Sequence, residues 1–238
     1  MSDVVLITGA SSDIGLALIE RLASYPEPPK LLAHCHSGAD RLPAAVHLMV
    51  CDLSQAASVS ALADKILTEH GCPHRFVHLP GLKLRYERFT KFDWEHFETD
   101  LRIQVQSAVI LLKRFLPLMV KLPGARIVFV SSSVTRGVPP KFMSMYTVVK
   151  QAQLGLMRSL AAEYAESGVG VNAVSPGMVE TRFLENIPHT VREMSAAASP
   201  RHRNASPKDV VDAIEFLLSP KAGYITGIEL PVTGGAVY

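Results

Sequence analysis

Short apolar runs alternate with helical patterns from one end of the chain to the other, and this alternation strongly limits the folds open to it. The first run, residues 4–8, is rich in β-branched residues, and the stretch after it places Ile14, Leu18 and Leu22 at helical spacing. Buried strands that alternate with helices predict a parallel sheet covered on both faces. Since no linker or repeat interrupts the 238 residues, we expect a single α/β domain over residues 1–238. Further strands are predicted at 31–35, 47–50, 76–80, 126–132, 169–175 and 228–232, and further helices at 59–68, 97–120 and 145–165.

Charge and composition narrow the classes of partner. The net charge is only +2, and basic residues are interspersed with acidic ones, which is unlike a nucleic-acid-binding protein. No apolar run is long enough to span a bilayer, and the N-terminal segment lacks a basic, cleavable leader. The three cysteines suggest no disulfide framework. These features predict a cytoplasmic protein that acts on a metabolite or on a small carrier protein, and that binds neither membranes nor nucleic acids.

Histidine and cysteine residues are frequent in the first third of the chain, for example at His34, Cys35 and His36. Structural zinc sites use compact ligand pairs on turns. These residues instead fall within or beside predicted strands, where neighbouring side chains point to opposite faces of the sheet. We therefore expect no metal site.

The segment ITGASSDIG, residues 7–15, follows the first predicted strand and opens the first predicted helix. In such a unit the unpaired N–H groups of the helix and its dipole favour a pyrophosphate, and Gly9 and Gly15 flank the turn that would hold it. Asp13 is expected to cap the helix and to point away from the phosphates. The groups expected to face the phosphates are Ser11, Ser12 and the N–H of Ile14.

Three polar residues in the second half of the chain suggest acid–base chemistry. Tyr146 and Lys150 are four residues apart on a predicted helix, so their side chains share one face. A nearby ammonium favours the phenolate and is expected to lower the pKa of Tyr146, which is ordinarily near 10. Ser133, thirteen residues before the tyrosine, follows a predicted strand and can hydrogen-bond the same substrate oxygen. The set predicts a phenol that donates a proton to a developing alkoxide.

Six segments together resemble the short-chain dehydrogenase/reductase family over essentially the whole chain: TGASSDIG, CDLS, SSSV, YTVVK, VNAVSPGMVET and YITGIELPVTGG. The resemblance implies a Rossmann-like, doubly wound sheet of about seven strands, a nicotinamide cofactor, and hydride transfer to or from a carbonyl carbon. It assigns Tyr146 as the acid/base, Lys150 to the nicotinamide ribose and Ser133 to the carbonyl. Ser131 and Ser132 are close alternatives, and the thirteen-residue spacing favours Ser133. Asp52 and Leu53 match positions that contact adenine, and Pro176, Gly177, Val179 and Thr181 match the turn at the nicotinamide end.

Three positions depart from the pattern of the family. The loop lacks its middle glycine, where Asp13 stands. The usual Asn-Asn-Ala-Gly turn is replaced by HLPG, residues 78–81, and because Pro80 has no N–H, the cofactor contacts expected from Pro80 and Gly81 must differ. Gln104 stands where the family commonly has an asparagine that arranges a proton-relay water. This substitution suggests a relay that is rearranged, slowed or absent.

His36 and Ser37 follow the second predicted strand, where NAD-dependent proteins of this fold carry an Asp or Glu for the ribose hydroxyls. Since no carboxylate stands there to repel a 2′-phosphate, we expect NADP(H) rather than NAD(H), with His36 or Ser37 near the phosphate. The arginine that often accompanies this preference is missing from the loop and from the strand end.

Within the family, VNAVSPGMVET and the C-terminal segment are most similar to β-ketoacyl-acyl-carrier-protein reductases and related ketoreductases. This implies reduction of a β-keto group on an acyl thioester in fatty-acid or polyketide-type biosynthesis. Two alternatives remain open: an oxidoreductase of a free small ketone or alcohol, and a catalytically weak, cofactor-binding partner subunit in a biosynthetic complex. The candidate apolar pocket residues are Phe89, Phe92, Trp94, Phe142, Met143 and Met145. The candidate contacts to an acidic carrier protein are Lys83, Arg85, Arg88, Lys91, Arg136 and Arg182.

Two further expectations concern the outside of the domain. The irregular stretch at about 181–206 is expected to form a flap over the substrate cleft. The family resemblance implies a homotetramer or a dimer, with the helices around 97–120 and 145–165 packed between subunits.

Overall fold

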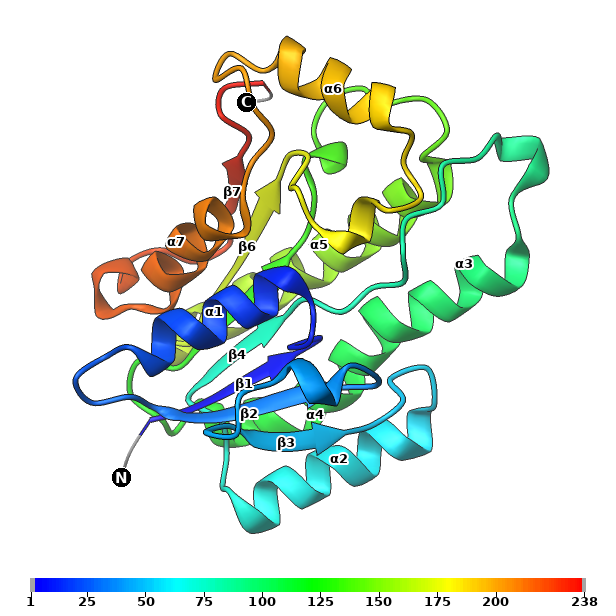
Figure 1. Ribbon diagram of the computed structural model, residues 1–238. Coiled ribbons are helices and arrows are strands. Elements are labelled where there is room, and N and C mark those ends of the chain that lie inside the picture. Colours follow the sequence, from blue (N-terminus) through cyan, green and yellow to red (C-terminus); the bar gives the residue numbers. More distant parts are fainter. Residues whose placement is uncertain (1–2, 237–238) are drawn as a thin grey trace.

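The computed structural model describes residues 3–236, so residues 1–2 and 237–238 of the predicted domain lie outside the described part. Seven parallel strands form one sheet in the order β3-β2-β1-β4-β5-β6-β7 (Figure 1). The order reverses between β1 and β4, which confirms the doubly wound, Rossmann-like fold. The strands are β1 Val4–Thr8, β2 Lys30–Cys35, β3 His47–Val50, β4 Arg75–His78, β5 Arg126–Val130, β6 Gly170–Pro176 and β7 Glu229–Val232.

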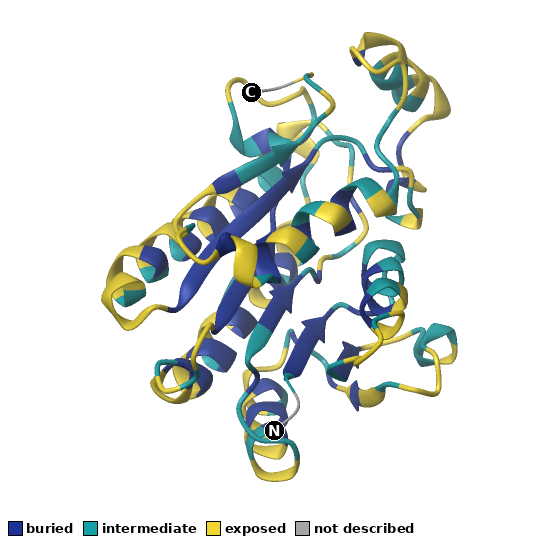
Figure 2. Cartoon of the chain, turned by 90° about the vertical axis from the view of Figure 1, so that its left-hand side faces the viewer, coloured by how far each residue is buried: buried dark blue, intermediate teal, exposed yellow. Residues whose placement is uncertain are grey.

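Helices cover both faces of the sheet because successive side chains of each strand point to opposite sides. Val4 and Leu6 pack with α2, α4 and α5, whereas Val5 and Ile7 pack with α1 and α7. The five inner strands are accordingly buried, whereas the edge strand β3 is mostly exposed, and the helices turn their exposed residues outward (Figure 2). Among residues 3–236 no helix has the length and apolarity needed to cross a bilayer. The helices are α1 Asp13–Ala23, α2 Ala56–Glu69, α3 Trp94–Leu101, α4 Ser107–Met119, α5 Ser144–Tyr164, α6 His189–Ala198 and α7 Pro207–Leu218.

The long helix predicted at 97–120 is interrupted. After α3 ends, a π-helical turn spans Arg102–Gln106, and α4 then continues the helix. Such a turn inserts an extra residue and is frequent at functional sites. Gln104, in the middle of this turn, is buried.

The carboxyl ends of β2, β1 and β4 place two histidines on either side of Thr8. His34 and His78 are both paired in register with Thr8 and are almost fully buried. His78 Nε2 lies 2.9 Å from the carbonyl oxygen of Gln104, and His34 Nε2 lies 3.1 Å from that of Cys51. Because a carbonyl only accepts hydrogen bonds, Nε2 of each ring carries a proton, and burial lowers the pKa of both rings far enough to keep them neutral. Polar contacts therefore fix the strand ends directly beneath the predicted phosphate loop.

The predicted flap contains a 3₁₀ turn at Arg182–Leu184 and helix α6. Leu184 and Ile187 from this segment pack with Leu84 and Met143 in a third apolar cluster beyond the sheet. Tyr146 is partly buried against the same cluster. The segment thus lies over the carboxyl end of the sheet, near the predicted tyrosine.

Candidate active site

The predicted phosphate loop is built on two close backbone approaches. Gly9 has φ +74°, and a Cβ on it would lie 2.8 Å from the backbone of Pro80. A Cβ on Gly15 would lie 2.5 Å from the carbonyl oxygen of Ala10. Only glycine avoids both clashes, so these two residues set the shape of the loop. The backbone of Pro80 packs directly against the loop at Gly9, a contact that the sequence did not reveal.

The helix cap is Ser12, and the prediction that Asp13 caps α1 is wrong. The Ser12 hydroxyl accepts a hydrogen bond of 3.1 Å from the N–H of Gly15. Asp13 is the first residue of α1, and its carboxylate accepts instead from Arg41 Nη2 at 2.7 Å and from the Arg182 N–H at 2.7 Å. The N–H of Ile14 finds no acceptor within the described residues and remains available to an anion. The side chains of Arg41 and Arg182 and the backbone N–H of Arg182, rather than the N–H groups of α1, satisfy the carboxylate.

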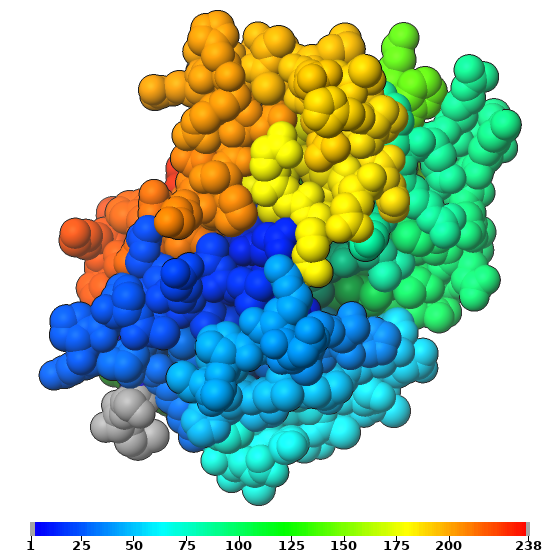
Figure 3. All heavy atoms as spheres, in the orientation of Figure 1, coloured from blue at the N-terminus to red at the C-terminus, as the bar shows by residue number. Residues whose placement is uncertain are grey.

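Arg41 and Arg182 converge on the loop, although the sequence suggested that no arginine was near. Arg41 Nη1 donates to the carbonyl oxygen of Ser11 at 2.6 Å, and Arg182 Nη2 donates to the same oxygen at 3.1 Å. The Ser11 hydroxyl in turn donates to the carbonyl oxygen of Ser37 at 2.8 Å. Figure 3 shows the flap segment, in yellow, lying directly against the dark blue N-terminal loop. Arg41 was missed because it lies in a 3₁₀ turn six residues beyond β2.

The other predicted cofactor residues lie at the carboxyl ends of the strands. His36 and Ser37 follow β2, and Asp52 follows β3. Two hydrogen bonds from Ser54 lower the pKa of the Asp52 carboxyl, and the nearby His36 lowers it by a smaller amount. Pro176 ends β6, and Val179 forms an isolated bridge with Ala205. Parallel strands present their carboxyl ends on one edge of the sheet, which is where this fold binds nucleotides. The remaining predicted positions on this edge are Leu53, Gly177 and Thr181.

Tyr146 and Lys150 share one face of α5, as predicted. Lys150 Nζ lies 5.8 Å from the centre of the Tyr146 ring and donates to the carbonyl oxygen of Val130 at 2.9 Å. The side chain of Ser132 interacts with the phenol and lowers its pKa, whereas the spacing pointed to Ser133. Ser133 is the first residue of a 3₁₀ turn that the side chain of Ser132 caps. The structure thus brings together Ser132, Tyr146 and Lys150.

Burial shifts the two ionisable groups in opposite directions. Burial raises the pKa of Tyr146 to about 12, with the charge of Asp100 adding to this and the Ser132 hydrogen bond opposing it. Burial lowers the pKa of Lys150 to about 8, and the charge of Asp100 opposes that change. The expectation that Lys150 lowers the pKa of the phenol is therefore wrong for the protein alone. At neutral pH the tyrosine is a proton donor.

Gln104 is tied into a buried network. Its Nε2 donates to Asp100 Oδ1 at 2.8 Å, and its carbonyl oxygen accepts from His78. Its Oε1 is buried and has no hydrogen-bond partner among the described residues. Gly81 lies against the amide, because a Cβ on it would come within 3.1 Å of Nε2. The glutamine side chain is thus turned toward α3 and the turn after β4.

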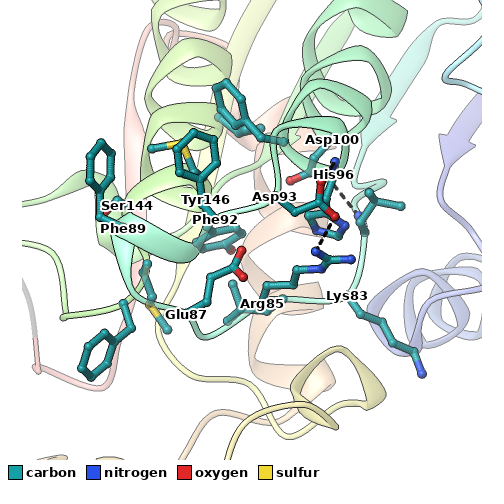
Figure 4. A pocket seen from close by; sticks show the side chains of 17 residues that line it. Lys83, Arg85, Glu87, Phe89, Phe92, Asp93, His96, Asp100, Ser144 and Tyr146 are labelled. Atoms are coloured by element: carbon teal, nitrogen blue, oxygen red, sulfur yellow. Dashed lines mark hydrogen bonds and ion pairs between the residues drawn. The ribbon is translucent and has the colours of Figure 1, made fainter.

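A pocket beside Tyr146 opens between α3, α5 and the segment 82–92 (Figure 4). Of the predicted apolar residues, Phe89, Phe92, Phe142, Met143 and Met145 line it, whereas Trp94 does not. Four of the six basic residues considered for a carrier protein already face carboxylates of this chain. Those pairs are Lys83–Glu185, Arg85–Asp93, Arg136–Glu229 and Arg182–Asp13.

The chain is similar to known oxidoreductases over nearly its full length. A family model described as enoyl-(acyl carrier protein) reductase matches residues 22–237. The 3-oxoacyl-[acyl-carrier-protein] reductase of Vibrio cholerae is 32% identical over 237 residues, which cover 98% of this chain and 96% of that protein. The cis-4-hydroxycyclohexanecarboxylate dehydrogenase of Sinomonas cyclohexanicum is 32% identical over 239 residues, covering 98% and 95%. The crystal structure of 3-ketoacyl-(acyl-carrier-protein) reductase from Brucella melitensis, complexed with NADH, has a TM-score of 0.88 at 26% identity and covers 98% of both chains.

Proposed function

The chain belongs to the short-chain dehydrogenase/reductase family, and on that basis we propose that it is an NADP(H)-dependent ketoreductase of β-ketoacyl thioesters. The observation that carries the proposal is the grouping of the partly buried Tyr146 with the buried Ser132 and Lys150 at the carboxyl edge of the sheet. A phenol kept protonated beside an ammonium and a hydroxyl is suited to donate a proton to a carbonyl oxygen as that oxygen gains charge.

The residues at the loop fit a dinucleotide. The glycine turn brings backbone close to a ligand, the N–H of Ile14 is free to donate, and two guanidinium groups lie beside Ser11. These residues would hold a reduced nicotinamide, which would supply a hydride to a carbonyl carbon. Tyr146 gives its proton to the carbonyl oxygen, Ser132 hydrogen-bonds that oxygen, and Lys150 holds the ribose. The hydride and the proton together convert the ketone into an alcohol.

We assign Arg41, beside Ser37, to the 2′-phosphate of the cofactor. Replacement of Arg41 by Ala is expected to raise the KM for NADPH about tenfold and to leave the KM for NADH nearly unchanged, because a charge-assisted hydrogen bond to phosphate is lost. The measurement is initial rates with each cofactor. Arg114→Ala removes an exposed arginine that pairs with Asp64 on α2, and serves as the matched control. Equal effects on both cofactors, or better catalysis by wild type with NADH, contradict the assignment.

Asp13 competes with a cofactor phosphate for the same two arginines. In Asp13→Asn the ion pairs with Arg41 and Arg182 are lost. We expect the Kd for NADPH to fall about fivefold to thirtyfold, since the two partly exposed pairs are together worth about 1–2 kcal/mol. Titration of cofactor fluorescence measures this, with the exposed Glu98→Gln as the control. Weaker binding by Asp13→Asn shows that the carboxylate helps to hold the cofactor instead.

An acyl thioester is supported by the relatives and by the pocket. The 3-oxoacyl-[acyl-carrier-protein] reductase of V. cholerae acts, by its name, on such a substrate, and the pocket beside Tyr146 is largely apolar. The relative from S. cyclohexanicum, a dehydrogenase of a free cyclic hydroxy acid, supports a free ketone or alcohol as the second candidate. Among the basic residues considered for a carrier protein, Arg88 and Lys91 form no ion pair in residues 3–236.

The test is a panel of β-ketoacyl thioesters and free ketones with purified protein, in which NADPH oxidation is followed. Faster turnover of the thioesters supports the proposal, and turnover of free ketones alone selects the second candidate. Binding of NADPH without turnover of any substrate selects a non-catalytic partner subunit.

We also propose that the chain assembles as a homodimer or homotetramer through α4 and α5. Val109 and Leu118 of α4 and Val148 of α5 are exposed apolar residues on these helices. Burial of such side chains between subunits is favourable.

A further inference from the structure

Asp100 is an unusual residue for its position. It is the one buried residue of α3 and is only 6% exposed. A buried carboxylate is costly unless other groups compensate it. No arginine or lysine nitrogen lies within 4 Å of it in the described part of the chain. Its burial therefore calls for an explanation beyond an ordinary ion pair.

Hydrogen bonds fix the Asp100 carboxylate in one orientation. Oδ1 accepts from Gln104 Nε2 at 2.8 Å and from the N–H of Leu82 at 3.1 Å. Gln104 belongs to the π-helical turn, and Leu82 belongs to the segment that follows β4. The carboxylate is thus held from two sides at the wall of the pocket that it shares with Tyr146 (Figure 4).

Lys150 is a buried cation with a single hydrogen bond to a neutral carbonyl, that of Val130. An ammonium in such surroundings tends to lose its proton. Helix α3 packs against α5, which carries Lys150, and Asp100 is the carboxylate within residues 3–236 whose charge raises the pKa of that lysine. The same charge raises the pKa of Tyr146. The anion and the cation therefore stabilise each other across the site.

We propose that Asp100 is a positioning residue that supplies the counter-charge for Lys150, so that the buried lysine remains an ammonium at neutral pH. The kinetic consequence rests on the proposed function, because Lys150 acts on the cofactor ribose and on Tyr146 in its charged form. The titration of Lys150 itself does not depend on any substrate. Asp100 thus acts through Lys150 rather than on the substrate.

Several other charged or titratable groups face this region and bear on its pH dependence. The loop and α3 contribute groups around the pocket, and the sheet contributes a buried imidazole near Lys150. These groups are Lys83, Arg85, Glu87, Asp93, His96 and His78. His78 is held neutral, and Arg85 and Asp93 neutralise each other. Asp100 is therefore the group whose removal changes the charge next to the lysine.

The experiment is a titration of protein labelled with carbon-13 at the lysine Cε, followed by NMR. Comparison with Lys150→Arg identifies the resonance of Lys150. In Asp100→Asn the amide oxygen still accepts from Gln104 and Leu82 but the charge is gone. We expect the midpoint of Lys150 to fall by about one pH unit relative to wild type. Asp100→Glu, which keeps the charge, is expected to restore the midpoint.

Glu98→Gln is the matched control, because it neutralises an exposed carboxylate on the same helix that pairs with Arg102. Its Lys150 midpoint is expected to equal that of wild type. Asp100→Ser provides a second neutral variant if Asp100→Asn does not fold. An unchanged midpoint in the neutral variants overturns the proposal, whether or not the protein turns over a substrate. With an active substrate, kcat/KM declines at alkaline pH, and the midpoint of that decline is expected to fall in the neutral variants by the same number of pH units as the midpoint of Lys150.

Discussion

Replacement of Tyr146 by Phe is expected to lower kcat/KM for carbonyl reduction about 10³-fold while leaving the fold and the Kd for NADPH nearly unchanged. The ring keeps its packing against the cluster of Leu84, Met143 and Leu184. Only the hydroxyl is lost, and with it the proton donor that Ser132 orients. The measurement is NADPH oxidation with the best substrate of the panel, accompanied by fluorescence titration of cofactor binding.

Tyr224→Phe is the control, because the side chain of Tyr224 is fully exposed. Its kcat/KM is expected to match that of wild type. A Tyr146→Phe variant that retains a tenth or more of the activity assigns proton donation to another group and removes the central support of the proposed function. Weakened cofactor binding with unchanged kcat also contradicts a role in proton transfer.

Acidification is expected to destabilise the fold strongly, because His34 and His78 are buried as neutral rings. Burial lowers the pKa of His34 to about 4 and that of His78 to about 3. Between these values and 6.5 the unfolded chain binds more protons than the folded one, so the free energy of unfolding falls as the pH falls. From pH 7 to pH 5 the two rings together account for a loss of about 4 kcal/mol.

Urea unfolding followed by circular dichroism at pH 7 and pH 5 measures this loss. His78→Gln keeps a donor for the Gln104 carbonyl but does not titrate. From pH 7 to pH 5 its free energy of unfolding is therefore expected to fall by about 2 kcal/mol less than that of wild type. In His189→Gln an exposed histidine is replaced, and the free energy of unfolding is expected to fall between pH 7 and pH 5 by as much as in wild type. If His78→Gln does not fold, His34→Gln supplies the comparison. Equal pH dependence in wild type and in the buried-histidine variants would falsify this explanation.

Periodicity and strand–helix alternation were sufficient to predict the sheet. All seven predicted strands exist, and the first, Val4–Thr8, has the predicted bounds. Two departures are helix α7, Pro207–Leu218, which was not among the predicted helices, and the π-helical turn at Arg102–Gln106, which interrupts a segment that was predicted as a single helix. Apolar spacing cannot reveal such a turn, because it depends on local polar contacts such as those of His78 and Gln104. The sequence marked Gln104 as unusual but gave no sign of its partner Asp100.

The site was predicted less fully, because its details depend on contacts between distant segments. Spacing along the chain pointed to Ser133, whereas the strand end and the turn after it bring Ser132 to Tyr146. Arg41 could not be assigned from the sequence, because it lies six residues beyond the end of β2, where the phosphate contact was expected. The shift in the pKa of Tyr146 was predicted with the wrong sign, because the surroundings that raise this pKa are set by the fold and not by spacing along one helix.

The contacts of Asp13 join three segments that are far apart in the sequence: the N-terminal loop, the turn after β2 and the start of the flap. Ion pairs at a partly exposed position weaken as dissolved salt accumulates around them. A rise in ionic strength is therefore expected to loosen the attachment of the segment around Arg182 to the N-terminal loop.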